Sequence, residues 1–162
     1  MSGALAFWKT AHILSAAVLF GTGLGIAFFT WFGYRHAMRA GDIGAMRATL
    51  RLTVVADAWL TAPAVVFQAV SGVVLVMLLG WPLWSAWSVA VWSLFLFTGA
   101  CWLPVVWIQL RMRDVAEEAA RYEIALPPRY FRLFRIWFRL GWPAFAGVIA
   151  IFALMIWKPA LW

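Results

Sequence analysis

Few side chains in this sequence are able to bind a metal or transfer a proton, and His12 is the first of them. It follows Lys9 by about one helical turn, near the start of a long apolar stretch. A neutral imidazole at this position can ligate a haem iron or relay a proton. The alternative is a histidine that forms a hydrogen bond to another helix or turns toward the membrane surface. We take His12 as the candidate ligand.

The only other histidine cannot supply a second axial ligand within the same chain. His36 lies 24 positions after His12, which is about 36 Å along a helix. Met77 and Met155 are expected at a depth similar to that of His12, and a thioether is a known axial haem ligand. Each methionine is otherwise a core residue that fills space. A five-coordinate haem with an open position also fits the sequence.

Two lysines accompany His12 at the same predicted depth. Lys9 and Lys158 are the only lysines of the chain, and no arginine is expected near them. Haem propionates that point outward would bind such cations, although each lysine alone is explained by anchoring at the membrane surface. The sequence therefore predicts a haem b site of His12, Lys9 and Lys158, with Met77 or Met155 as a sixth ligand.

Asp57 is the only acidic residue within an apolar stretch. It follows Arg51 by about two turns, so we expect it to face the membrane surface and pair with an arginine. A role in proton relay is the alternative, because ionisable groups inside a bilayer are costly and tend to be functional.

Small residues on the first apolar stretch predict close helix packing. Gly21 and Gly25 form a GxxxG spacing, which lets two helix backbones approach each other. The contact would lie within the bundle or between protomers of a homo-oligomer.

The elements that position these residues are membrane-spanning helices. Of 162 residues, 66% are hydrophobic and 12% are charged, with a mean hydropathy of +0.90. This composition excludes a soluble enzyme domain or a disordered chain, and the lone Cys101 excludes a disulfide scaffold. Stretches long enough to cross a bilayer lie at about 11–33, 54–79, 84–110 and 140–157. We expect an all-α, integral membrane four-helix bundle, a single transmembrane domain over residues 1–162.

The charges define a topology for this bundle. All 11 arginines lie between the first and second stretches or between the third and fourth, whereas Lys9 and Lys158 lie on the opposite side. The positive-inside rule places both termini outside and both arginine-rich loops in the cytoplasm of a multi-pass protein of the inner (plasma) membrane. Topology and membrane lipid then explain the net charge of +7, and nucleic acid is not needed.

The second arginine-rich loop contains two helical patterns. Arg113, Glu117 and Arg121 have the spacing of ion pairs on a helix, which extends the third span as far as Tyr122. After two prolines, the arginines at 129, 132, 135 and 139 fall on one face of an expected interfacial helix.

This arginine face supports a different class of function. Arg129, Arg132 and Arg135 would hold anionic lipid or dock a cytoplasmic partner. The chain would then be a non-catalytic membrane subunit with a structural His12. A transporter ranks third, because no charged residue is expected at mid-membrane.

The chain resembles an uncharacterised bacterial family of four-helix integral membrane proteins, catalogued as a domain of unknown function. Residues 8–12, 61–66 and 100–107 carry the resemblance. The chain is also distantly similar to the HemJ-type protoporphyrinogen oxidases, through Trp8-Lys9-x-x-His12 and the arginine-rich residues 131–135. That similarity implies that His12 is the counterpart of a proposed haem ligand. An Asn-Glu pair and a third-helix lysine of that family are missing here, so haem binding is implied more strongly than its oxidase activity.

Overall fold

The computed structural model describes residues 3–158, and its elements are all helices. They are α1 (Gly3–Ala40), α2 (Ile43–Ala56), the π-helix η1 (Asp57–Thr61), α3 (Ala62–Leu78), α4 (Ala86–Arg121) and α5 (Pro128–Trp157). Because α2, η1 and α3 follow one another without a break, the described part of the chain forms four long helices. Each is long and apolar enough to cross a membrane. The predicted all-α four-helix architecture is confirmed.

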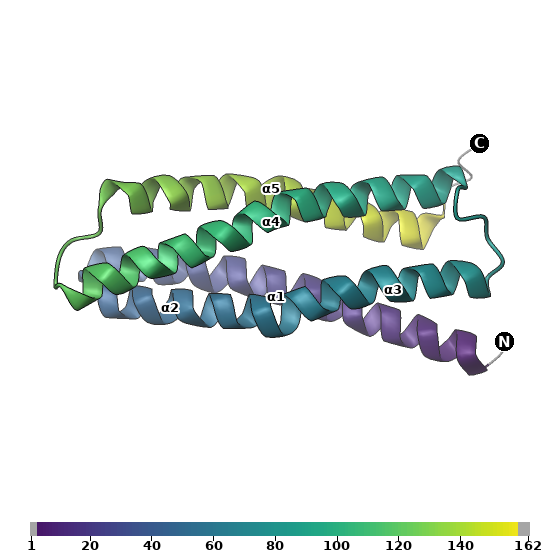
Figure 1. Cartoon of the computed structure of the whole chain (residues 1–162), viewed down its shortest axis with the longest axis horizontal. Coiled ribbons are helices and arrows are strands. Elements are labelled where there is room, and N and C mark those ends of the chain that lie inside the picture. Colours follow the sequence, from purple (N-terminus) through teal and green to yellow (C-terminus); the bar gives the residue numbers. More distant parts are fainter. Residues whose placement is uncertain (1–2, 159–162) are drawn as a thin grey trace.

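Consecutive long helices run in opposite directions, so both ends of the described chain lie at the same end of the bundle (Figure 1). Lys9 and Lys158 lie there, and we call this the lysine end. The α1–α2 and α4–α5 connections lie at the other end, together with the arginines that precede and follow them. We call this the arginine end.

Local sequence signals explain where the helices begin and end. Gly41 ends α1 with a φ of 67°, and Asp42 caps α2 by accepting a hydrogen bond from the Ala45 N–H at 2.9 Å. Gly80 has a φ of 66° just after α3. Ser85 then caps α4 by accepting from the Ser88 N–H at 3.2 Å. The predicted short turn between the second and third spans is therefore present.

The helices are longer than the predicted spans and project beyond them at the arginine end, and α1 also begins before its span at the lysine end. α1 has 38 residues, which corresponds to about 57 Å, whereas a hydrocarbon core is about 30 Å thick. α4 reaches Arg121, as the charge spacing predicted.

The separate interfacial helix after the two prolines was a wrong expectation. Residues 129–139 form the first turns of α5 and continue without a break into the fourth span. Their apolar face, with Tyr130, Phe134 and Trp137, is buried against the other helices, and α5 continues through Gly141 and Pro143 into the span. This packing keeps the segment in line with the bundle.

The hydrophobic core lies at the arginine end. Met46 and Leu50 of α2 meet Met112 of α4 and Tyr130 of α5, and none of these four side chains is exposed. Tyr130 donates a hydrogen bond to Met46 Sδ at 3.0 Å. On α1, Tyr34 stacks on Phe134 with 4.1 Å between ring centroids. All four long helices therefore contribute to this core.

Toward the lysine end, the bundle is divided into two pairs of helices. α1 packs against α3 and α4 packs against α5, whereas α3 and α4 have few close contacts despite their short connection (Figure 1). The pairs meet where Phe20 of α1 contacts Phe145 and Phe152 of α5, with centroids 6.0 and 5.5 Å apart. This half is consequently packed less tightly than the arginine end.

Gly21 and Gly25 do not provide a close approach within the bundle. A Cβ added at either glycine would have no neighbour within 4 Å. At Gly33, in contrast, an added Cβ would lie 2.9 Å from the Thr49 side chain. The intramolecular half of the GxxxG prediction is therefore wrong, because the face of α1 that meets α2 carries Gly33 instead. A contact of Gly21 and Gly25 between protomers stays a prediction.

At Gly147, α5 lies close to Thr98 of α4. A Cβ at Gly147 would collide with the Thr98 hydroxyl, whereas one at Gly141 of the same helix would meet nothing within 4 Å. We expect Gly147→Ala to lower the free energy of unfolding by about 1–3 kcal/mol. Gly141→Ala should leave it unchanged or raise it by up to about 1 kcal/mol. Thermal unfolding in detergent measures both, and equal melting temperatures would contradict the packing.

Candidate functional site

His12 lies in the seam between α1 and α3, in the lysine-end half of the bundle. Its Nδ1 is 2.7 Å from Ser71 Oγ of α3, and the imidazole is partly buried. Beside Ser71, a Cβ added at Gly72 would lie 3.7 Å from His12 Cε1. The Gln68 side chain donates to the His12 carbonyl at 3.2 Å. Residues on two adjacent turns of α3 thus contact His12.

The contacts of Ser71 indicate which imidazole nitrogen carries the proton. The Ser71 hydroxyl has a single proton, and its oxygen is 2.6 Å from the Phe67 carbonyl of its own helix. Because the hydroxyl donates to this carbonyl, its oxygen accepts from the His12 Nδ1–H. The Nε2 atom is then left unprotonated, with a lone pair available to a metal ion.

Neighbouring contacts continue the seam above and below His12. Trp8 stacks on Phe67 with 6.2 Å between ring centroids. Ser15 donates to the Ala64 carbonyl at 3.3 Å. These contacts keep α1 and α3 in register, so the imidazole cannot shift along α3 without losing them.

The hydrogen bond of His12 to α3 matches the structural alternative that the sequence left open, a histidine bonded to another helix. It occupies Nδ1 alone. Histidines that bind metals commonly donate the other ring N–H to a neighbouring acceptor, which fixes the ring orientation. The observed bond is therefore compatible with either a structural or a ligating imidazole.

The two candidate methionines differ in their exposure. Met77 is 63% exposed on α3. Met155 is partly buried on α5, three residues after Phe152, whose ring contacts Phe20 of α1. Since residues three apart share a helix face, Met155 lies on the side of α5 that faces α1. Of the two, only Met155 is turned toward the helix that carries His12.

The two lysines occupy the lysine end as predicted, but in different settings. Lys9 is partly buried one turn before His12. Lys158 ends α5 in a left-handed conformation, with Nζ 5.3 Å from the centre of the Trp81 ring. Nearby, the Trp87 indole donates to the Leu154 carbonyl of α5 at 3.1 Å. Both cations are thus available at this end of the bundle.

A second polar cluster surrounds Asp57, near the middle of the long helix formed by α2, η1 and α3. Asp57 is 4% exposed, and the described ion pairs all involve other acids. The prediction that it faces the surface and pairs with an arginine is therefore wrong. Six residues correspond to one and two-thirds helical turns, so Arg51 and Asp57 lie on different faces. A count of turns from the sequence could have found this.

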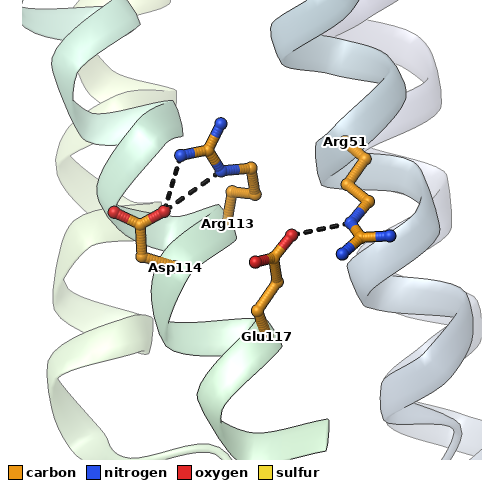
Figure 2. Close-up of polar contacts among 4 residues, drawn as sticks. All are labelled: Arg51, Arg113, Asp114 and Glu117. Atoms are coloured by element: carbon orange, nitrogen blue, oxygen red, sulfur yellow. Dashed lines mark hydrogen bonds and ion pairs between the residues drawn. The ribbon is translucent and has the colours of Figure 1, made fainter. Parts of the chain in front are cut away.

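The arginine end carries three ion pairs between side chains of the described chain. Arg51 of α2 donates to Glu117 of α4 at 2.6 Å, and Arg113 pairs with the adjacent Asp114 at 2.7 Å (Figure 2). The hydrogen bond from Arg51 lowers the pKa of the Glu117 carboxyl, which lies beyond the apolar span. The predicted i, i+4 pair of Arg113 with Glu117 is replaced by these contacts, because Glu117 turns toward α2.

Two arginines of α5, Arg132 and Arg135, are available to lipid or to another molecule. Arg129 pairs with Glu118 at 2.6 Å. Arg132 and Arg135 are exposed, and neither is in an ion pair of residues 3–158. As exposed ion pairs contribute little to stability, the significance of this face lies in its charge.

Fold and composition together define a four-helix, multi-pass integral membrane protein. Residues 6–159 match the family model described as "Predicted integral membrane protein (DUF2269)", and the chain belongs to this family. No curated protein and no solved structure matches the chain. Contact of the spanning helices with membrane lipid follows from this assignment.

The tautomer of His12 is directly testable, because the chain has only two histidines. In protein labelled with ¹⁵N-histidine, we expect the His12 Nδ1 to be protonated and Nε2 to be unprotonated. The variant His36→Gln assigns the signals. Ser71→Ala should remove the preference for this tautomer, whereas Ser93→Ala, at an exposed serine, should not. A protonated Nε2 in the unmodified protein would contradict the assigned direction of the hydrogen bond.

Proposed function

We propose that this protein binds a b-type haem in the lysine-end half of the bundle and has a redox or porphyrin-handling role, with His12 Nε2 as an axial ligand. The single observation that carries the proposal is the hydrogen bond between His12 Nδ1 and Ser71 Oγ. With Nδ1–H donated to Ser71, Nε2 would be a free base on an oriented ring, which is the arrangement common in histidines that bind metals.

The residues around His12 fit such a group. Gly72 places no side chain beside the imidazole, and a Cβ added there would be in van der Waals contact with His12 Cε1. The two helix pairs have few close contacts toward this end, so a flat ligand would not have to displace a packed core. When bound, the haem would supply reversible one-electron chemistry at its iron. His12 would hold the iron, and Ser71 would orient His12.

Lys9 and Lys158 support the same orientation. Both lie at the lysine end, where propionates would find positive charge that the rest of this end lacks. Met155 is favoured over Met77 as a sixth ligand, because Met77 is mostly exposed. A site without a sixth ligand would leave a position open for a reactant.

The position of the proposed haem site in the membrane is inferred from the distribution of charged residues. With the arginine end in the cytoplasm of a bacterial cell, the haem site would lie near the outer face of the inner membrane. An electron partner or a porphyrin would then reach His12 from the lysine end or from the lipid.

The exposed arginines support a second candidate. Arg132 and Arg135 are free to dock an acidic partner or anionic lipid. In this case the protein would be a non-catalytic membrane subunit, with His12 acting only in the seam.

The two candidates are separated by the colour of the purified protein. We expect membranes from haem-replete cells to yield protein with a Soret band. His12→Ala should abolish the band, and His36→Ala should retain it. Ser71→Ala should weaken haem retention by about 10–100-fold, which is typical when the partner of a metal-bound histidine is removed.

Circular dichroism must show that His12→Ala remains helical. Colourless unmodified protein, or a folded His12→Ala protein with an unchanged spectrum, would overturn the haem proposal. Loss of a co-purifying partner in Arg132→Ala and Arg135→Ala would then favour the second candidate.

A further inference from the structure

The chain contains a buried carboxylate that the proposed haem site does not use. Asp57 begins η1, the π-helical turn between α2 and α3. Two residues after this turn comes Pro63, which has no N–H to donate and so disrupts the regular helical bonding. Wide turns of this type are frequent at functional sites. Here the turn keeps Asp57 and Thr61, each 4% exposed, on the same inward face.

Neutral polar groups surround this carboxylate. The side chains of Thr61, Trp102 and Gln109 lie beside it, the last two from α4. Gln109 is 2% exposed. At the preceding turn of α2, Thr53 is hydrogen-bonded to Thr30 of α1 at 2.9 Å. The elements packed here thus present hydroxyl, amide and indole groups to Asp57.

Three oxygen atoms in this cluster have no partner. They are Asp57 Oδ2, Thr61 Oγ1 and Gln109 Oε1, and each is buried without a hydrogen bond in the described part of the chain. Leaving even neutral oxygens unpaired in an apolar interior is unfavourable, and an unpaired charge is far more so. A proton or a cation bound here would neutralise the carboxylate and give these oxygens a partner.

No side chain of the described residues supplies that partner. Arg51 lies on another face of the same long helix, and its side chain forms an ion pair with Glu117. The other ion pairs occupy Asp114 and Glu118. A positive charge at Asp57 would therefore have to be supplied by a bound ion or proton.

We propose that Asp57, Thr61 and Gln109 form a binding site for one small monovalent cation. The available atoms are a carboxylate oxygen, a hydroxyl oxygen and an amide oxygen, which are hard ligands. A single carboxylate balances a single positive charge, whereas a divalent ion would leave excess charge in a low-dielectric interior. Residues 3–158 contain no cluster of three histidine, cysteine or acidic side chains suited to a transition metal.

Na⁺ and the proton share this chemistry. Either would neutralise Asp57 and satisfy the oxygens beside it. The site is independent of the haem proposal, since Asp57 precedes Ser71 by 14 residues, about 21 Å along the helix. Failure of one proposal therefore leaves the other standing.

Thermal unfolding of the purified full-length protein tests the site. Melting temperatures are compared in NaCl, KCl and choline chloride at equal ionic strength and fixed pH. If Na⁺ binds, NaCl should raise the melting temperature, by about 3 °C or more for each tenfold increase above the dissociation constant. Asp57→Asn should abolish this rise. Glu117→Gln, which removes an acid outside the site, should retain it.

A second pair of variants tests the site if Asp57→Asn fails to fold. Thr61→Val should raise about tenfold the cation concentration needed for the same increase in melting temperature. Thr98→Val, which also removes a buried unpartnered hydroxyl of a threonine but at Gly147, should leave the response unchanged.

The proton has its own signature. If a proton occupies the site, the unmodified protein should respond alike to the three salts and show the infrared carbonyl band of a carboxylic acid. Asp57→Asn should remove that band. The proposal is overturned if Asp57→Asn and Thr61→Val respond to every salt as the unmodified protein does and no carboxylic acid band depends on Asp57.

Discussion

Enclosure of Tyr130 at the arginine end is the interaction that holds the four helices together. Its ring is fully buried, and its hydroxyl donates to Met46 Sδ across the bundle. Around it, α1 contributes Tyr34 and α4 contributes Met112. In a membrane, where lipid is as apolar as the helix surfaces, association depends on such close packing and on interhelical hydrogen bonds. The helices therefore have one shared core, and the two helix pairs are free to diverge beyond it.

In the lysine-end half, polar groups within the spans hold α1 and α3 together. His12 with Ser71, Gln68 with the His12 carbonyl, and Ser15 with the Ala64 carbonyl all join α1 to α3. The same bonds that stabilise this pair also select a tautomer of His12. Positioning of the imidazole is thus a by-product of helix pairing, and it does not depend on how close α4 and α5 are.

Length and charge made the spans predictable, whereas helix orientation was not. Unbroken apolar stretches and the arginine distribution indicated the four helices and the extension of α4 to Arg121. The spans are apolar on all sides, so no periodicity revealed which face is buried. That is why Gly21 and Gly25 were assigned to a contact they do not make, and why Met77 and Met155 were equivalent candidates until their exposure was known. Asp57 was misplaced for a different reason, because a partner close in sequence was preferred to its angular position.

The uneven packing of the bundle has a consequence for both candidate sites. Segments with few buried contacts open at low free-energy cost, whereas core segments open only with global unfolding. His12 lies in the loosely packed half, where a large planar ligand could enter between the helix pairs without disturbing Tyr130 and its neighbours. Asp57 borders the tightly packed half, where Thr61 and Gln109 are held almost without exposure. Such a closely packed setting would accommodate a small ion and exclude a larger ligand, so the two proposed sites would take ligands of different size.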